Sequence, residues 1–257
     1  MLTEQLYPIL EYDDDPVGKL DPANLVKYFT DELNADKLVI TFFPEVMKTL
    51  IEAGEIELAR VIPGENPVEI YRFLDQPDTL VTLGQVGCPA CGGNLDLIQA
   101  MGVDKVMFCG GGGVLDRGID VGRLLVVDGA IRDEGFSYHY LPPSRVVEAD
   151  PGVNERIVRY LEANGVPYIR GLTWMTDAFF RETADRIARR KAEGAKIVEM
   201  EQAGCLAVAK CRGFAYGALI YGGDDVSGDE WSDRGWRSRN GIRYDLVTLC
   251  RKLVREI

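Results

Sequence analysis

Two pairs of carboxylates follow apolar runs that are typical of buried strands. Glu199 and Glu201 lie in Val-Glu-Met-Glu, where a predicted strand gives way to a predicted helix. A carboxylate at such a junction can accept hydrogen bonds from both vicinal hydroxyls of a ribose. Alternatively, Glu201 only favours the N-terminus of a helix through the helix dipole. The residues alone leave both interpretations open.

The second pair is Asp224 and Asp225, which follow Gly-Gly after an apolar run. Adjacent carboxylates can shift each other's pKa values apart, so that one group holds a proton near neutral pH. Such a proton could be donated to a leaving group. The alternative is a turn or a helix cap, because aspartate is common at both.

Four consecutive glycines come directly after another predicted strand, and they are Gly110, Gly111, Gly112 and Gly113. A glycine loop there would let backbone N–H groups approach an anion or a sugar, and the alternative is a tight turn. Neither the G-x-G-x-x-G pattern of dinucleotide sites nor a Walker-type Gly-Lys-Ser/Thr is present, so NAD and ATP are disfavoured as ligands.

Three further features could contribute to a site. Phe179, beside Phe180, could stack on a flat heterocycle or simply pack in the core. His139 is the only histidine and is a candidate acid, base or ligand contact, although a structural role is equally open. Cys88 and Cys91 form a lone C-x-x-C without a second pair, which disfavours a metal site and leaves a redox role as a minor alternative.

Short apolar runs alternate with amphipathic stretches along the chain. Strands are predicted at 37–41, 68–73, 79–85, 105–109, 123–127, 167–172, 196–200 and 215–221. Helices are predicted at 44–53, 89–101, 153–163, 177–193 and 201–211, and a terminal helix carries Leu246, Leu249, Cys250, Leu253 and Val254 on one face. This order predicts an α/β fold around a parallel or mixed sheet, with chemistry at the carboxyl ends of strands.

Length and composition limit the function classes. The 257 residues carry a net charge of −12 and 46% hydrophobic residues, which is typical of one globular domain. We expect a single domain over 1–257, with an N-terminal extension (1–36) and a C-terminal segment (232–257). The negative charge disfavours nucleic acid as a partner. Neither a membrane span nor a secretory signal is recognisable, so a cytoplasmic setting is expected.

Taken in order, these motifs resemble the nucleoside phosphorylase and uridine phosphorylase superfamily. The resemblance covers about 37–231. Residues 109–113 and 129–140 are similar to the family's Gly-Thr-Gly-like turn and its Gly-x-Ile-Arg-x-Glu-x-x-Ser-x-x-Tyr stretch. Residues 176–180 are similar to Thr-x-Asp-x-Phe-Tyr, and 198–201 to Val-x-Met-Glu. The family's late Ser-Asp element is similar to Gly223-Asp224, followed by 227–231.

The resemblance implies a mixed, partly barrel-like sheet flanked by helices, and cleavage of a nucleoside's N-glycosidic bond. By position, Glu201 and Met200, with Glu199, would bind the ribose, and Phe179 would pack on the base. Asp224 would protonate a purine nitrogen or hydrogen-bond to it as the base leaves. The resemblance implies a homo-oligomer, such as a dimer or a trimer of dimers, and no cofactor besides phosphate as a co-substrate.

Two positions depart from the family. Val46 and Phe108 occupy the positions of the family's two phosphate-binding arginines. This replacement favours water over phosphate as the acceptor of the sugar. Replacements could come from a neighbouring subunit or from Arg117, Arg132 or Arg145. The uracil-reading Gln-x-Arg falls on Thr183 and Asp185, which favours a purine. The alternatives are therefore a phosphorylase, a nucleosidase and a nucleoside-binding protein without activity.

Overall fold

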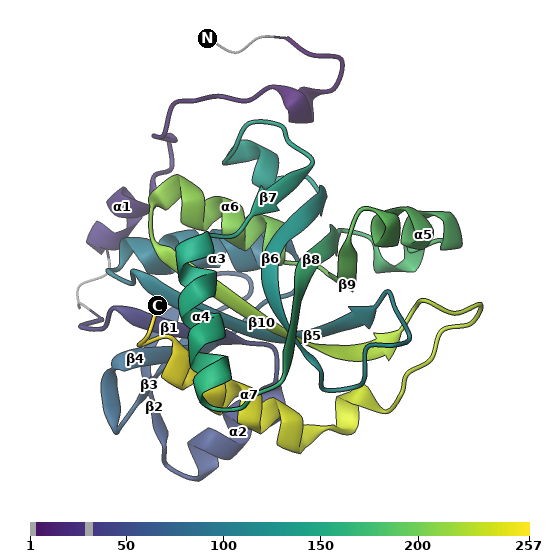
Figure 1. Cartoon of the computed structure of the whole chain (residues 1–257). Helices are drawn as coiled ribbons and strands as arrows, with labels where there is room; N and C mark the ends of the chain where they lie inside the picture. Colours follow the sequence, from purple (N-terminus) through teal and green to yellow (C-terminus); the bar gives the residue numbers. More distant parts are fainter. Residues whose placement is uncertain (1–3, 29–32) are drawn as a thin grey trace.

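Ten strands of the described chain form one sheet, part of which closes on itself. The computed structural model describes residues 4–28 and 33–257 (Figure 1). The sheet order is β10-β6-β8-β9-β5-β1-β4-β3-β2, and β7 pairs with β6. The strands are β1 (Lys37–Thr41), β2 (Ile56–Ile62), β3 (Val68–Phe73), β4 (Gln76–Leu83), β5 (Lys105–Val114), β6 (Leu124–Asp133), β7 (Val146–Glu148), β8 (Tyr168–Thr176), β9 (Ala195–Glu199) and β10 (Ala215–Asp225).

The closure joins β5 to β10, so that β10, β6, β8, β9 and β5 form a five-stranded mixed barrel. Within it, β5 and β10 run parallel, as do β6 with β8 and β8 with β9, while β9 is antiparallel to β5 and β10 to β6. Strands β1 to β4 extend this barrel as an outer sheet. The expected α/β fold with a mixed, partly barrel-like sheet is confirmed.

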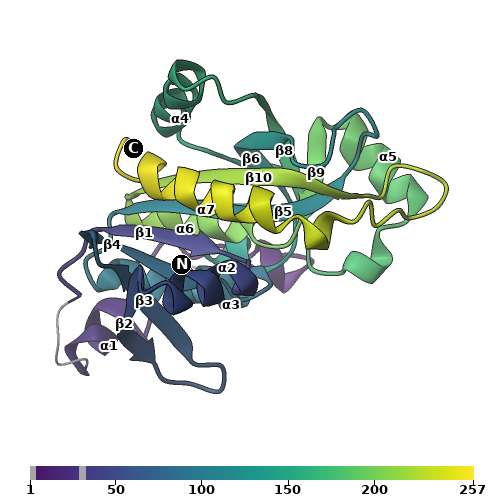
Figure 2. The same cartoon turned by 90° about the horizontal axis from the view of Figure 1, so that it is seen from below.

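Helices cover the sheet on both sides, and each side has its own apolar cluster. α3 and α6 supply Leu95 and Leu206 to one cluster, while α2, α4 and α7 supply Leu50, Ile157 and Leu246 to the other (Figures 1 and 2). α5 lies beside β9. The helices are α2 (Pro44–Glu52), α3 (Cys88–Ala100), α4 (Pro151–Ala163), α5 (Ala184–Ala192), α6 (Gln202–Arg212) and α7 (Asn240–Leu253).

Local sequence accounts for where several helices begin and end. Asp150 caps α4 by accepting hydrogen bonds from the N–H groups of Gly152 and Val153, and Pro151 occupies its first turn. Gly213 ends α6 in the left-handed conformation, at φ +76°. The predicted helices at 153–163 and 201–211 therefore match α4 and α6 closely.

One predicted helix was wrong. The stretch 177–193 is not continuous, because a short 3-10 turn, η4 (Phe179–Arg181), precedes α5. Thr183 between them is extended, with ψ 156°, and an α-helix cannot pass through that conformation. Phe179 therefore lies on a turn rather than on a helix.

The glycine run was also misjudged, because it forms neither a loop nor a turn. Gly110, Gly111 and Gly112 continue β5 and pair with β10, and Gly113 pairs with Val198 of β9. A Cβ atom on Gly112 would lie 2.4 Å from the Val198 carbonyl oxygen. At Gly112 the neighbouring strand approaches too closely for a side chain, whereas at Gly110, Gly111 and Gly113 neighbouring side chains occupy that space.

The N-terminal extension includes η1 (Pro8–Leu10), α1 (Pro22–Leu25) and η2 (Val26–Tyr28). None of these three elements contains a buried residue. At the other end, η5 (Trp236–Ser238) leads into α7, which confirms the predicted terminal helix. Among the described residues, no helix is both long and apolar enough to cross a membrane.

Candidate active site

The junction of β9 and α6 buries Glu201. Strand β9 ends at Glu199, and α6 begins at Gln202 with Glu201 as its N-cap residue. Glu201 is 7% exposed, and its Oε1 accepts a hydrogen bond of 2.8 Å from the Gly87 N–H at the start of α3. Gly87 has φ +96°, which favours glycine. Two helix N-termini therefore meet at this carboxylate.

Glu199 is buried beside it and already supports the start of α6. Its Oε2 accepts hydrogen bonds from the N–H groups of Glu201 (2.7 Å) and Gln202 (2.8 Å). Within the described chain, Glu199 Oε1 is buried without a hydrogen-bond partner. Burial, with the charge of Glu201, raises the pKa of Glu199, and burial also raises that of Glu201. Met200, between them, is partly exposed.

Asp224 lies on β10, close to this junction. Its Oδ2 accepts a hydrogen bond of 2.7 Å from the indole N–H of Trp231, and its Oδ1 would lie 3.6 Å from a Cβ atom on Gly113. Because Gly113 pairs with Val198, the residue before Glu199, the strand register brings Asp224 and the two glutamates into one region. The structure thus gathers the predicted sugar-side and base-side carboxylates.

Of the two interpretations left open for Asp224 and Asp225, the contacts of Asp225 favour the turn. Asp225 is buried and accepts hydrogen bonds from Ser227 Oγ (2.6 Å) and Arg117 Nε (3.3 Å). Burial acts to raise the pKa of Asp225, but these hydrogen bonds outweigh it and the net shift is downward. Asp225 therefore anchors the following loop as a carboxylate.

The charge of Asp224 also acts on a carboxyl group of another segment. Glu182, between η4 and α5, is half-buried, and burial together with the Asp224 charge raises its pKa to about 7. Glu182 was not among the predicted site residues, because it lies in a charged stretch that is typical of the solvated face of a helix. Trp231 and Gly87 were missed as well, since their contacts depend on residues distant in the chain.

Phe179 and Phe180 project from η4 and pack on each other with ring centroids 4.0 Å apart. Phe179 is 52% exposed and Phe180 is 88% exposed, so neither belongs to the core. An exposed aromatic ring on the segment that carries Glu182 is suited to stacking on a heterocycle.

Aromatic rings cover Gly110 and Gly111, the first two residues of the glycine run. A Cβ atom on Gly111 would lie 2.7 Å from the Tyr221 ring and 2.8 Å from Trp236, which also lies over Gly223. Residues 231–239 thus contribute Trp236 to packing and Trp231 to a hydrogen bond with Asp224. The predicted acceptor role of the four glycines remains a prediction, in which Gly113 is the member nearest Asp224.

The positions of the two missing arginines are apolar and buried. Val46 and Phe108 are each 2% exposed, and the Phe108 ring packs on Phe42 at 5.1 Å. Beside Val46, Glu45 forms an ion pair of 2.7 Å with Arg243 of α7. An anion at these positions would meet apolar side chains and a carboxylate.

The three candidate replacement arginines differ in availability. Arg132 is buried and holds the segment after β6 through Ser137, Ser144 and the carbonyls of Leu141 and Pro142. Arg145 pairs with Glu193. Arg117 pairs with Asp225, the neighbour of Asp224, but its side chain is 77% exposed. Of the three arginines, it is therefore the one best placed to contact a ligand beside Asp224.

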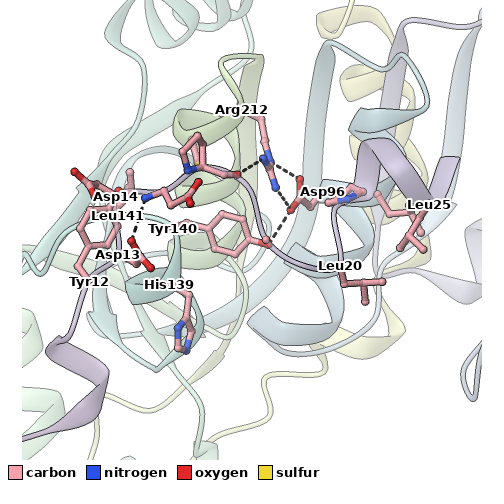
Figure 3. Close-up of a pocket in the computed structure, with 17 residues that line it drawn as sticks. Tyr12, Asp13, Asp14, Leu20, Leu25, Asp96, His139, Tyr140, Leu141 and Arg212 are labelled. Carbon is pink, nitrogen blue, oxygen red and sulfur yellow. Dashed lines mark hydrogen bonds and ion pairs between the residues drawn. The ribbon is translucent and has the colours of Figure 1, made fainter. Parts of the chain in front are cut away.

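His139 lies away from these carboxylates. It lines a cavity of about 630 Å³ between the N-terminal extension and the C-terminal end of α6, whereas Glu201 is at the N-terminal end of that helix. Figure 3 shows Arg212 and Tyr140 in this cavity, both bonded to Asp96.

Cys88 and Cys91 are free and buried on α3. The Cys91 Sγ lies 3.6 Å from that of Cys205 on α6. Burial raises the pKa of Cys88, and the contact with Cys205 together with burial raises that of Cys91. This environment opposes formation of the thiolate that a redox reaction requires.

The five-stranded mixed barrel with its outer strands is a nucleoside phosphorylase-like fold. A model of the phosphorylase superfamily matches residues 36–242, and the chain belongs to this superfamily. A guanosine phosphorylase of Halorubrum lacusprofundi is 24% identical over 204 residues, which are 70% of this chain and 84% of that protein. A uridine phosphorylase of Thermococcus kodakarensis is 28% identical over 137 residues, 53% of this chain and 48% of that protein.

Solved structures agree on the fold. A purine nucleoside phosphorylase of Toxoplasma gondii in complex with immucillin-H superimposes with a TM-score of 0.68 at 15% identity. A uridine phosphorylase of Vibrio fischeri superimposes with a TM-score of 0.70 at 16% identity. Each match covers 87% of this chain and 93% of the other.

Proposed function

We propose that the protein is a nucleoside phosphorylase-type enzyme that cleaves the N-glycosidic bond of a purine nucleoside, giving free base and ribose 1-phosphate. The observation that carries the proposal is the burial of Glu201 at the β9–α6 junction, in the same region as Asp224. Membership of the phosphorylase superfamily supports it.

The proposed roles follow from the charge that develops during cleavage. As the C1′–N bond breaks, positive charge builds on the sugar and negative charge on the base, and fixed groups that match this charge lower the barrier. Glu201, with Met200 and Glu199, would bind the ribose. Phe179 would stack on the base, and Asp224 would contact a ring nitrogen.

The preference for a purine rests on the base side. Thr183 and Asp185 replace the Gln-x-Arg pair with which uridine-specific relatives read uracil, and Asp185 has the wrong charge for that role. The similar proteins include a guanosine phosphorylase and a uridine phosphorylase. The match spans 84% of the guanosine phosphorylase but 48% of the uridine phosphorylase.

A nucleosidase that uses water is the second candidate, and a specific observation favours it. Val46 and Phe108 are buried in apolar surroundings, and the donors of Arg132 are used within its own segment. Each charge-assisted hydrogen bond contributes about 1.5–3 kcal/mol, so two missing arginines would weaken phosphate binding by orders of magnitude. If the enzyme is instead a phosphorylase, Arg117 or a second subunit would have to hold the phosphate.

The test is base release from a panel of purine and pyrimidine nucleosides, with and without phosphate. Phosphate-dependent release with ribose 1-phosphate as product supports the phosphorylase. Release that is indifferent to phosphate identifies the nucleosidase. Nucleoside binding by calorimetry without any release would identify a binding protein and contradict both enzymes. Light scattering on the same sample tests the expected dimer or trimer of dimers.

A further inference from the structure

Trp231 is an exposed tryptophan whose polar group is nevertheless engaged. The residue is 62% exposed, so packing in the core does not account for a tryptophan at this position. Its indole N–H donates a hydrogen bond of 2.7 Å to Oδ2 of Asp224. An indole has one donor and no acceptor, so the whole hydrogen-bonding capacity of this side chain goes to one carboxylate.

The loop that carries Trp231 is tied together by Asp225. Two backbone hydrogen bonds, of 2.8 and 3.0 Å, join Asp225 to Ser232. Inside the loop, Ser227 donates its N–H (2.8 Å) and its hydroxyl (2.6 Å) to Oδ1 of Asp225. The chain neighbours of Asp224 and of Trp231 are therefore bonded to each other, and the indole reaches Asp224 from a fixed frame.

This arrangement gives the two oxygens of Asp224 different surroundings. Oδ2 is held by the indole, and no other donor bonds to this carboxylate within residues 4–28 and 33–257. Oδ1 lies on the side of Gly113, 3.6 Å from the place of a Cβ atom there, and Gly113 pairs with Val198 of β9. A carboxylate held at one oxygen keeps one orientation, so Oδ1 is the oxygen available to a ligand.

We propose that Trp231 is a positioning residue, which holds Oδ2 of Asp224 so that Oδ1 is presented to a ring nitrogen of the departing purine. This inference rests on the proposed function and adds a residue to it. A carboxylate whose direction is already fixed needs no reorientation when charge develops on the base. Loss of the indole N–H should therefore lower kcat more than it raises KM.

The experiment compares inosine with 4-nitrophenyl β-D-ribofuranoside. Nitrophenolate leaves as a stable anion and offers no ring nitrogen, so its departure does not depend on Asp224. Trp231→Phe keeps an aromatic ring and removes the N–H. Tyr7→Phe is the matched control, because Tyr7 is 61% exposed and lies on the N-terminal extension, and the substitution again keeps a ring and removes a polar group. Thermal unfolding establishes that each variant is folded.

We expect Trp231→Phe to lower kcat for inosine by about tenfold or more, the effect of one hydrogen bond to a charged group. KM for inosine should change by less than about threefold. With the nitrophenyl riboside, Trp231→Phe should stay within about twofold of the wild type, as should Tyr7→Phe with both substrates.

A double-mutant cycle with Asp224→Ala, followed at high enzyme concentration, separates positioning from direct contact with the substrate. In the Asp224→Ala background, Trp231→Phe should change kcat for inosine by less than about twofold, because nothing is left to position. Additive losses, equal losses on the two substrates, or an unchanged kcat for inosine in Trp231→Phe would each overturn the inference. A wild type that cleaves neither substrate would overturn the proposed function, and the inference with it.

Discussion

The two sides of the candidate site are built differently. On the sugar side, Glu199 and Glu201 are buried at a strand-to-helix junction, and backbone N–H groups hold both carboxyl groups. On the base side, Phe179 and Trp231 stand on short loops and are more than half exposed. The sugar side is thus fixed by regular structure, while the base side depends on side chains that loops present.

This difference suggests a division of tasks. A ribose offers the same hydroxyls whatever base it carries, so a rigid arrangement can serve every substrate. Bases differ in size and in hydrogen-bonding groups, and loops can change without disturbing the core. We therefore expect substitutions on the sugar side to abolish activity toward all nucleosides, and substitutions on the base side to alter preference among them.

The largest effect is expected for Glu201→Gln. Glutamine can still accept the Gly87 hydrogen bond, but it loses the charge-assisted hydrogen bonds to the ribose, worth about 1.5–3 kcal/mol each. We expect kcat/KM to fall at least 100-fold with every base in the panel, at an unchanged unfolding temperature. A loss confined to one base would contradict the assignment of Glu201 to the sugar.

A smaller effect is expected on the base side, from Phe179→Ala. Losing a stacking ring costs about 1–3 kcal/mol, so KM for inosine should rise by about tenfold or more. Phe180→Ala is the matched control, because Phe180 is 88% exposed and contacts Phe179 ring to ring. We expect less than a threefold change there, and equal effects of the two substitutions would mean that only their mutual packing matters.

The same contrast separates what the sequence predicted from what it missed. The Val-Glu-Met-Glu motif and the helix after it are local features, because β9 ends and α6 begins within three residues. Capping by Asp150 and the stop at Gly213 are local too. The sugar side and most of the fold could therefore be anticipated.

The base side and the glycine run depend on contacts between distant segments. Residues 110–113 were expected to form a loop because glycine is uncommon inside strands, yet the rings of Tyr221 and Trp236 and the Val198 carbonyl occupy the space of their side chains. Only the tertiary structure shows that the indole N–H of Trp231 is donated to Asp224.

Glu199→Gln tests the buried sugar side through the pH dependence of the free energy of unfolding. A carboxyl group whose folded pKa is raised, here to about 8, keeps its proton in the folded protein while the unfolded chain ionises near pH 4.3. The contribution of Glu199 to the free energy of unfolding therefore declines as the pH rises from about 4.3 to about 8. We expect the unfolding free energy in urea to fall less from pH 5 to pH 8 in Glu199→Gln than in the wild type. Parallel pH curves for the two proteins would contradict burial of an ionisable Glu199.

The smallest effect is expected for His139→Ala. His139 was a candidate acid or base as the only histidine, but its side chain is exposed and lines the cavity beside Arg212, at the opposite end of α6 from Glu201. We expect kcat/KM to stay within twofold of the wild type, with no change in its dependence on pH between 5.5 and 8, the range in which an ordinary histidine titrates. A tenfold loss, or a vanished pH limb near 6.5, would assign the proton chemistry to that cavity. The division between a rigid sugar side and a loop-built base side would then describe only part of the reacting site.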